Sequence, residues 1–462
     1  MKLYVKEIIL ATDGVLIKGN LNSEIYSIST DSRRLKGKDL FIPLIGKNYD
    51  GHIFISDALN KGAIGFIFSN DIDFRLIESA EIVIKVKDTL KALQDIASYY
   101  REKAKFKVIA ITGSSGKTST KYFIVDLFKD LIPLNFSKEN YNNEIGVPLT
   151  ILDTPEDIRL LVLELAMRGL GEIRILSRIS KPDFALITNI GTAHIGLLGS
   201  KDNIAKAKSE IFDYLNPNGW AVLNGDDYYC RKIFKSLGDR YSKLTFGFKN
   251  HNDVKGNINY EKDKAYMNIL LPDGKKIDLI LPLFPLEIYQ NLLGGISLLW
   301  LNFPKLSMEW FNEKINISFP KQRLNIKKGK NNSLIIDDTY NANPNSMKVA
   351  IDFLKIIKGN RKIALLGDML ELGEFSLDLH KKVIDYAIRK KIDIIFLFGD
   401  EMKKAFLSLN DRYKNYPIIF EDNLENMKKK LLNEIKEKDV ILVKGSRGMC
   451  MERFIKDIED ET

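Results

Sequence analysis

The sequence predicts an α/β fold with three domains: a central phosphate-loop ATPase domain with a mostly parallel sheet, and a Rossmann-like domain at the C-terminal end. The length of 462 residues is enough for about three domains. Short apolar runs typical of buried strands alternate with helical patterns, as in parallel sheets built from βαβ units. A glycine-rich loop, ITGSSGKTSTK, joins one such strand to a helix.

The first domain is expected over residues 1–105. It contains the strand patterns YSIST, DLFIPLI, AIGFIFS and EIVIKV, with a helical pattern at ISDALNKG. The long helical pattern TLKALQDIASYYREKAK ends this domain.

The central domain is expected over residues 106–318 and the third domain over residues 319–462. The central strand patterns are VIAIT, LLVLELA and DFALITNIG, and those of the third domain are SLIIDDT, KIALLGDM, DIIFLFGD and DVILVKGS. Polar clusters follow these strands, and ligands of such sheets bind at the carboxyl ends of the strands. We therefore expect the binding sites at these ends.

Composition and charge narrow the class of protein. A hydrophobic content of 45% and a charged content of 28% are those of an ordinary globular protein. Two cysteines, Cys230 and Cys450, cannot form a disulfide framework, so a reducing cytoplasm is expected. The apolar part of MKLYVKEIILATDG is too short for a signal peptide, and no apolar run reaches membrane-spanning length. We expect a cytoplasmic monomer without membrane insertion.

The net charge of +9 does not predict a nucleic-acid partner. Lysines are scattered over every segment, and no basic stripe interleaved with aromatic residues is present. The excess charge suits anionic small-molecule substrates instead.

The loop ITGSSGKTSTK predicts a nucleotide site of unusual spacing. The general phosphate-loop pattern would place a glycine at Ile111, so this loop is shorter than the general one. A strand that feeds such a loop into a helix points backbone N–H groups and the positive helix end at an anion. An ordinary Gly-Ser turn would not need GKT at the start of a helix. The predicted ATP-binding residues of the loop are Gly113, Ser114, Ser115, Gly116, Lys117, Thr118 and Ser119.

Two side chains of this loop and one carboxylate outside it have expected roles in binding the nucleotide and its metal. Lys117 is expected at the β- and γ-phosphates and the Thr118 hydroxyl at Mg2+. Glu164 ends the apolar run LLVLELA, where a carboxylate is costly unless it is paired. Mg2+ prefers oxygen ligands and uses few protein carboxylates beside nucleotide oxygens, so Thr118 and Glu164 make a plausible partial shell. The alternative is a glutamate that faces solvent or pairs with Arg168.

The polar clusters, taken in order, resemble those of the Mur ligases through all three domains. DDTYNANP is the most specific of them, because it is characteristic of the member that adds a dipeptide, and the DNPR-like motif of the tripeptide-forming member is absent. The stretches that carry the resemblance are STDSRRLKGKDLFIPLIGKNYDGH, ITGSSGKTSTK, ENYNNEIGVPLT, LELAMRGLGEI, TNIGTAHIGLLGS, KAKSEIF, IDDTYNANPNSM, LGDMLELGEFSLDLH and VKGSRGMCME.

The resemblance implies an ATP-dependent ligase that joins D-alanyl-D-alanine to UDP-N-acetylmuramoyl-tripeptide through an acyl phosphate, giving a peptidoglycan precursor. It implies ATP and two Mg2+ ions. His194 would bind the second ion, together with Lys208 once CO2 has carbamylated that lysine, which requires a neutral amine. On the residues alone, His194 could be a histidine with one hydrogen bond and Lys208 a solvated helix lysine. The implied catalytic residues are Lys117, Glu164, His194 and Lys208, and the implied metal ligands are Thr118, Glu164, His194 and carbamylated Lys208.

Further contacts are implied by the same resemblance. Arg323 would reach the ATP phosphates, Asp338 the ribose and Asn291 the adenine, although PLEIYQNLLGG lacks the His-Asn pair that is usual before this asparagine. Capping or surface pairing is the alternative for Arg323 and Asp338. KGSRG, with Lys444, Ser446 and Arg447, could bind an anion or cap a helix. The implied substrate-binding residues are Ser29, Thr30, Asp31, Ser32, Arg33, Asn142, Asn143, Glu144, Arg168, Tyr340, Asn341 and Asn343.

Two other classes remain as alternatives. Another Mur-type ligase, or a folyl-polyglutamate-type amide ligase with a different acceptor, is the nearer one; the latter should lack STDSRR and YNANP, which are both present. A phosphate-loop protein that binds nucleic acid would be expected to have a glycine at position 111 and a clustered basic face. The third residue of the acceptor peptide and the tolerance for other dipeptides stay open. We also expect the third domain to close onto the second during catalysis.

Overall fold

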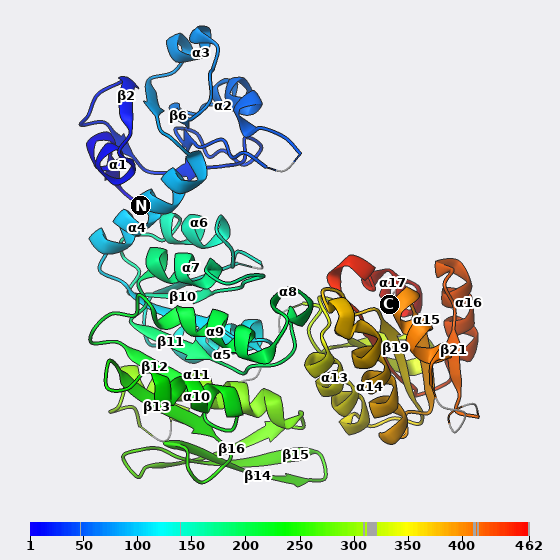
Figure 1. Cartoon of the computed structure of the whole chain (residues 1–462). Helices are drawn as coiled ribbons and strands as arrows, with labels where there is room; N and C mark the ends of the chain where they lie inside the picture. Colours follow the sequence, from blue (N-terminus) through cyan, green and yellow to red (C-terminus); the bar gives the residue numbers. More distant parts are fainter. Residues whose placement is uncertain are drawn as a thin grey trace.

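The computed structural model describes residues 1–46, 48–138, 140–307, 310–311, 321–409, 413 and 415–460. The predicted boundary at residues 318 and 319 lies outside the described residues, as does Glu139 at the start of ENYNNEIGVPLT. The described chain forms three α/β units that follow one another along the sequence (Figure 1). The predicted class, α/β with mostly parallel sheets, is confirmed; the exact domain boundaries stay a prediction.

The N-terminal unit is a small sheet in the order β2-β7-β6-β5-β4, in which β4 to β7 run parallel and β2 is antiparallel. Helix α4 begins after Asp88, whose side chain accepts a hydrogen bond from the Lys91 N–H. It buries Leu93 and Ile96 and packs on α6 and α7 of the next unit. The elements are β1 (Leu3–Tyr4), α1 (Val5–Thr12), β2 (Val15–Lys18), β3 (Glu24–Ile25), β4 (Ile28–Ser29), β5 (Leu40–Phe41), α2 (Ile55–Asn60), β6 (Gly65–Phe68), α3 (Phe74–Ser79), β7 (Ile82–Lys85) and α4 (Thr89–Lys103).

The middle unit is a larger mixed sheet in the order β16-β15-β14-β13-β12-β11-β8-β10-β9. The strands from β9 to β14 in this order run parallel, and β15 and β16 add an antiparallel extension that the sequence analysis did not predict. The elements are β8 (Lys107–Thr112), α5 (Lys117–Phe128), β9 (Leu134–Phe136), α6 (Gly146–Leu152), β10 (Leu160–Glu164), α7 (Glu172–Ser180), β11 (Phe184–Ile187), α8 (Ile195–Leu198), α9 (Lys201–Ser209), β12 (Trp220–Asn224), α10 (Tyr228–Ser236), β13 (Ser242–Gly247), β14 (Val254–Glu261), β15 (Lys264–Leu270), β16 (Lys276–Pro282) and α11 (Leu286–Asn302).

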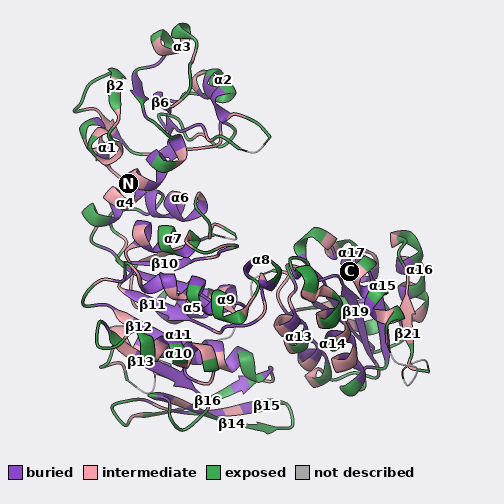
Figure 2. Ribbon diagram, viewed as in Figure 1, coloured by how far each residue is buried: buried purple, intermediate pink, exposed green. Residues whose placement is uncertain are grey.

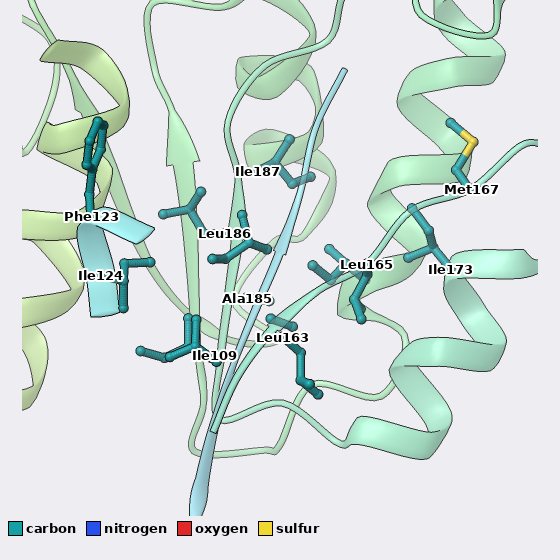
Figure 3. Packing of buried hydrophobic residues seen from close by; sticks show 14 of the residues in the cluster. Ile109, Phe123, Ile124, Leu163, Leu165, Met167, Ile173, Ala185, Leu186 and Ile187 are labelled. Carbon is teal, nitrogen blue, oxygen red and sulfur yellow. The ribbon is translucent and has the colours of Figure 1, made fainter. Parts of the chain in front are cut away.

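Strand β8 marks the point where the order of the parallel strands reverses. Its neighbours are β10 on one side and β11 on the other, and both pair with it in parallel. Figure 3 shows Ile109 of β8 and Leu186 of β11 packed near Ile124 of α5, whereas Leu163 of β10 lies on the other face of the sheet. Ligands of open α/β sheets bind at such a reversal, just beyond the carboxyl ends of the strands. The glycine-rich loop and Glu164 both lie at these ends.

The C-terminal unit is a sheet in the order β17-β18-β22-β19-β20-β21, parallel except for β17. Its two faces are covered separately: Ile336 belongs to the core shared with α13 and α14, and Ile335 to the core shared with α16 and α17. Helices on both faces give the expected Rossmann-like arrangement. The elements are β17 (Asn325–Gly329), β18 (Ser333–Asp337), α13 (Pro344–Ile356), β19 (Lys362–Gly367), α14 (Ser376–Arg389), β20 (Ile394–Phe398), α15 (Asp400–Leu407), β21 (Ile418–Phe420), α16 (Leu424–Glu434), β22 (Val440–Lys444) and α17 (Glu452–Ile458).

The middle and C-terminal units touch each other beside the glycine-rich loop. Figure 1 shows α8 extending from the middle unit to the C-terminal one. The rings of Phe284 and Phe353 stack across this boundary, with centroids 5.3 Å apart.

Buried residues follow the strands and the inner helix faces of each unit (Figure 2). Within the described ranges, every helix is too short or too polar to cross a bilayer.

Candidate active site

The glycine-rich loop is held in place by the end of β11. The Ser114 N–H donates to the Asn189 carbonyl over 3.0 Å, and the Ser115 N–H donates to Asn189 Oδ1 over 3.2 Å. Thr188 Oγ1 donates to the Ser115 carbonyl over 2.7 Å. A Cβ on Gly113 would lie 1.8 Å from Thr188 Oγ1, so the tight approach needs glycine here. The loop therefore has a fixed shape before any nucleotide binds.

The loop leads directly into α5 and presents Lys117 and Thr118 beside Glu164. Gly116, at φ 79°, is the residue before the helix. Lys117 Nζ donates to the Gly113 carbonyl over 2.9 Å, and Thr118 Oγ1 donates to Glu164 Oε2 over 2.9 Å. Glu164 Oε1 accepts from Asn142 Nδ2 over 3.1 Å. The sequence alternative of a solvent-facing glutamate does not hold, because Glu164 is only 3% exposed.

Glu164 lies among cations that keep it ionised. Burial acts to raise the pKa of its carboxyl, but the charges of Lys117, Lys121 and Arg323 outweigh it, and the pKa lies below its usual range. Burial lowers the pKa values of Lys117 and Lys121, with the Glu164 charge opposing that shift. Lys121 Nζ donates to the Ser137 carbonyl over 2.6 Å and lies 3.8 Å from Glu164 Oε2. The sequence analysis did not single out Lys121, although it follows Lys117 by one helical turn.

Thr118 and Glu164 fit a Mg2+ ion. Their oxygens are of the hard type that Mg2+ prefers, and a nucleotide in the loop would supply further oxygens. In the part of the chain that the structure describes, there is no cluster of three or more His, Cys, Asp or Glu side chains that could hold a metal alone.

Lys208 is buried, unlike its neighbours Lys201 and Lys206. It is 1% exposed, and its Nζ makes no hydrogen bond to the described residues. Burial, with the nearby charge of Lys117, holds the pKa of Lys208 well below its usual value. The alternative of a solvated helix lysine is therefore wrong, and the lowered pKa favours the neutral form of the amine.

His194 precedes α8 and contacts the C-terminal unit. Its Nδ1 lies 2.6 Å from Glu371 Oε2, and Glu371 Oε1 lies 3.3 Å from Arg168 Nε. Arg168 therefore pairs with Glu371, and not with Glu164 as the sequence alternative had it. Glu371 belongs to the quoted stretch LGDMLELGEFSLDLH, but the sequence analysis gave it no role.

Asp338 and Lys444 form a buried ion pair at the end of the C-terminal sheet. Lys444 Nζ lies 2.5 Å from Asp338 Oδ2 and donates to the Asn341 carbonyl over 2.9 Å. Burial lowers the pKa of Lys444, and the Asp338 carboxylate opposes that shift. The guanidinium of Arg323 stacks 4.2 Å from the centre of the Tyr340 ring. These contacts shape the DDTYNANP loop.

Asn343, an implied substrate-binding residue, shapes the loop that carries it. Its Oδ1 accepts from the Ser346 N–H over 2.9 Å and so caps α13, with Pro344 at the first helical position. Its Nδ2 donates to the Ser114 carbonyl over 3.3 Å. The capping asparagine thus joins the C-terminal unit to the ATP loop.

Asn291 packs directly against the ATP loop. A Cβ on Gly116 would lie 2.6 Å from both amide atoms of Asn291. Asn291 is buried and makes no hydrogen bond with the described residues, which leaves its amide available to a ligand. Gln290, one residue earlier, donates to Asn224 Oδ1 and Asp226 Oδ2 over 3.1 and 3.0 Å.

A cleft with a volume of 1260 Å³ lies between the middle and C-terminal units. Five of its lining residues are basic, which suits a polyphosphate. Its lining combines ATP-loop and DDTYNANP residues: Thr118, Tyr122, Asn140, Lys321, Gln322, Arg323, Asn325, Lys327, Asp337, Tyr340, Asn341, Arg447, Glu452, Ile455, Lys456 and Glu459.

A second cleft of 600 Å³ lies between the N-terminal and middle units. Ser29, Thr30, Asp31 and Asn143 line it, together with the basic side chains Arg34, Lys36 and Lys138, which the sequence analysis missed. Asn143 Oδ1 also accepts from the Gly146 N–H over 2.8 Å, at the start of α6.

The remaining predicted residues of this cleft differ in exposure. Arg33 is 82% exposed and makes two 2.9 Å contacts with Asp31, and its guanidinium lowers the pKa of Asp31 to about 2. Ser32 is buried, whereas Glu144 is exposed and only its carbonyl is bound, by Gln94. The structure thus gathers Ser29 to Asp31 into the cleft but leaves the side chains of Arg33 and Glu144 facing solvent.

Known proteins match this chain along its whole length. Residues 24–101 match the Mur ligase family catalytic domain, residues 111–299 the Mur ligase middle domain and residues 322–447 the Mur ligase glutamate ligase domain. The UDP-N-acetylmuramoyl-tripeptide–D-alanyl-D-alanine ligase of Bacillus subtilis is 33% identical over 96% of each chain. That of Escherichia coli is 29% identical over 94% of each chain.

Solved structures of Mur ligases are also similar to this chain along most of its length. MurF from Acinetobacter baumannii superposes with a TM-score of 0.88 at 30% identity, covering 99% of this chain and 98% of that one. MurF from Thermotoga maritima, in complex with ADP, has a TM-score of 0.80 at 27% identity, covering 93% and 96%. A folylpolyglutamate synthase from Mycobacterium tuberculosis shares the fold alone, at 14% identity, a TM-score of 0.62 and coverage of 81% and 95%. The chain belongs to the Mur ligase family.

Proposed function

We propose that this protein is the ATP-dependent ligase that adds D-alanyl-D-alanine to UDP-N-acetylmuramoyl-tripeptide, giving the UDP-MurNAc-pentapeptide precursor of peptidoglycan. The curated relatives that match almost the full chain carry the name of this activity. The observation in the structure that supports it best is the 1260 Å³ cleft, because Thr118 of the ATP loop and Tyr340 and Asn341 of the dipeptide motif line the same space.

The chemistry requires activation of a carboxylate. The terminal carboxylate of the tripeptide attacks the γ-phosphorus of ATP, the bond to the β-phosphate oxygen breaks, and ADP leaves. The amine of D-alanyl-D-alanine then attacks the carbonyl carbon of the acyl phosphate. Phosphate leaves with one oxygen of the original carboxylate, and the amine loses its proton. No nucleophile from the protein is needed.

The protein supplies position and charge to both steps. The carboxylate and the γ-phosphoryl group are both anionic, so their approach is favoured where cations lie close by. Lys117 and the backbone N–H groups at the start of α5 would hold the phosphates. Arg323, stacked on Tyr340 in the cleft, brings a further cation from the C-terminal unit. Holding the two substrates together in one cleft makes the reaction effectively intramolecular.

Two metal ions are part of the proposal. Thr118 and Glu164 would hold the first, and His194 with carbamylated Lys208 the second. Bound Mg2+ neutralises negative charge on the transferring phosphoryl group. The lowered pKa of Lys208, and the absence of a hydrogen-bond partner for it among the residues that the structure describes, support its modification.

The N-terminal cleft is the proposed site of the UDP-sugar. It has basic side chains for a diphosphate in Arg34, Lys36 and Lys138, and hydroxyl groups in Ser29 and Thr30. The domain assignment follows: residues 1–105 bind the UDP-sugar peptide, residues 106–318 bind ATP, and residues 319–462 contribute to ATP and dipeptide binding. We further propose that the protein works as a cytoplasmic monomer, since one chain provides all of these residues.

Phosphate release tests the function. The purified protein is mixed with ATP, Mg2+ and UDP-MurNAc-tripeptide, with and without D-alanyl-D-alanine, using acceptors with lysine and with diaminopimelate at the third position. We expect phosphate release that depends on the dipeptide, and a pentapeptide product by mass. Lys117→Ala serves as the inactive control. No turnover with either acceptor would contradict the proposed substrates.

A further inference from the structure

The loop between β19 and α14 makes a concentrated contact with the middle unit. Glu371 is its central residue. One carboxylate oxygen lies 2.6 Å from His194 Nδ1 and the other 3.3 Å from Arg168 Nε. The Glu371 carbonyl also accepts from the Gly196 N–H over 3.2 Å. One residue of the C-terminal unit thus binds three residues of the middle unit by side chain and backbone.

The backbones on both sides have an unusual conformation at this contact. His194 and Glu371 both have a φ of 62°, in the left-handed region that residues other than glycine seldom occupy. Such conformations persist only where the surroundings hold them, and they cluster at functional sites. Next to them, a Cβ on Gly196 would lie 2.4 Å from the Gly373 N atom. The two backbone segments, at Gly196 and Gly373, approach so closely that neither glycine could carry a side chain without a shift.

Hydrogen bonds within the C-terminal unit hold the loop that carries Glu371. The Met369 N–H donates to His380 Nε2 over 2.9 Å, and the Leu370 N–H donates to Ser446 Oγ over 2.8 Å. His380 is fully buried, and burial lowers its pKa, which keeps the ring neutral and its Nε2 able to accept. The carboxylate of Glu371 is therefore presented by a rigid loop.

We propose that Glu371 is a positioning residue that latches the C-terminal unit onto the middle unit and fixes the ring of His194 through Nδ1. With Nδ1 engaged, only Nε2 of His194 is open to another partner. The proposal deepens the proposed function, on which it rests for the place of His194 in the active site. It also gives the stretch LGDMLELGEFSLDLH a role: its strand end, loop and following helix hold one carboxylate at the boundary between the two units.

The contact of Glu371 with His194 contributes more to holding the two units together than its contact with Arg168. The Arg168 side chain is 76% exposed, and exposed ion pairs contribute little because solvent screens them. The side chains of His194 and Glu371 are 23% and 35% exposed, and their contact is shorter. A carboxylate on the far nitrogen of a functional histidine typically sets its tautomer and orientation.

The test combines kinetics with small-angle X-ray scattering of the ligand-free, full-length protein. Glu371→Ala removes the carboxylate, whereas Glu371→Gln keeps an acceptor for His194 but loses the charge. Gly196→Ala leaves all charges in place and inserts a methyl group where Gly373 lies. Glu374→Gln, at an exposed residue on the same loop, is the matched control.

We expect Glu371→Ala to lower kcat/KM by about 10- to 100-fold, mainly in kcat, while Glu371→Gln restores most of the activity. Glu371→Ala and Gly196→Ala should both increase the radius of gyration, since each weakens the contact between the units. Glu374→Gln should match the wild type in both measurements.

Two results would overturn the latch. One is a loss of activity in Glu371→Ala with an unchanged radius of gyration in both Glu371→Ala and Gly196→Ala. The other is a Glu371→Ala variant that equals Glu374→Gln in both measurements. If circular dichroism shows Glu371→Ala to be unfolded, Gly196→Ala decides by its scattering alone. Scattering needs no substrate, so a wild type without dipeptide-dependent turnover would refute the proposed function and leave the latch to be judged separately.

Discussion

The clefts of 1260 and 600 Å³ are the proposed sites of ATP (the ATP cleft) and of the UDP-sugar (the UDP-sugar cleft), and the charged side chains near them differ in exposure. Near Lys117 of the ATP loop the charged groups are buried: Glu164, Lys121 and Lys208 are each at most 3% exposed. At the 600 Å³ cleft, Asp31 is 28% exposed and pairs with Arg33, whose side chain is 82% exposed. Charges interact far more strongly when water is excluded. We therefore expect substitutions of the buried charges near Lys117 to have larger effects than a substitution at the exposed Arg33.

The largest effect is expected at Lys117. Lys117→Ala removes the cation that the structure places on the ATP loop, and loss of a preorganised charge at a transferring group costs about a thousandfold in kcat. Steady-state phosphate release measures it. Lys129→Ala, on the exposed end of the same helix, is the control and should keep wild-type activity. Equal activity in the two variants would remove Lys117 from the mechanism.

The second effect concerns stability. Lys121→Met leaves the buried Glu164 with one cation fewer and the Ser137 carbonyl without its donor. Breaking a buried pair by removing one partner costs about 3 kcal/mol. Urea unfolding should show this loss, and Lys129→Met should show a much smaller one, because its partner Asp126 lies at the surface. A similarly small loss of unfolding free energy in both variants would mean that the burial of a charge does not decide how much it contributes to stability.

The third effect is steric. Gly116→Ala places a methyl group 2.6 Å from the Asn291 amide at a residue with φ 79°. We expect KM for ATP to rise about tenfold. Gly274→Ala has nearly the same backbone angle, φ 84°, but nothing within 4 Å of the new Cβ, and so isolates the collision from the backbone strain. An unchanged KM in Gly116→Ala would show that the contact with Asn291 does not shape the nucleotide site.

The smallest effect is expected in the UDP-sugar cleft. Asp31 has a pKa of about 2 in the folded protein against 3.8 in its free form, mainly through the hydrogen bond from Arg33. A lowered folded-state pKa stabilises the fold, fully so above pH 3.8, and that contribution is lost as the pH falls through about 2. Arg33→Ala should therefore lower Tm slightly at neutral pH, and the difference should vanish only well below pH 2. A large change at neutral pH would contradict the screening argument.

The sequence predicted the parts of the fold and site that depend on local patterns. The strand before ITGSSGKTSTK, the helix after it and the carboxylate at the end of LLVLELA all lie where the patterns put them, because strand ends in a parallel sheet share one edge. Thr118 and Glu164 are in contact as expected. The three-domain α/β class followed from the same alternation.

What the sequence could not give depends on contacts between distant segments. Lys121 reads as a helix lysine like any other, and only the fold buries it beside Glu164. Glu371 lies 177 positions from His194, so their contact has no local signal. The Asn142 amide donates to Glu164, a contact that the sequence did not predict; its binding of the substrate stays a prediction. The antiparallel strands β15 and β16 alternate in burial like any exposed hairpin, and nothing in their residues shows that they extend the central sheet.

The central claim is that the tripeptide carboxylate is phosphorylated in the cleft between the middle and C-terminal units. UDP-MurNAc-tripeptide labelled with oxygen-18 in its terminal carboxylate tests it directly. The account predicts that one labelled oxygen per turnover appears in the released phosphate, measured by mass spectrometry. Unlabelled phosphate from a reaction that still yields the pentapeptide would contradict an acyl phosphate and the role given to the cleft.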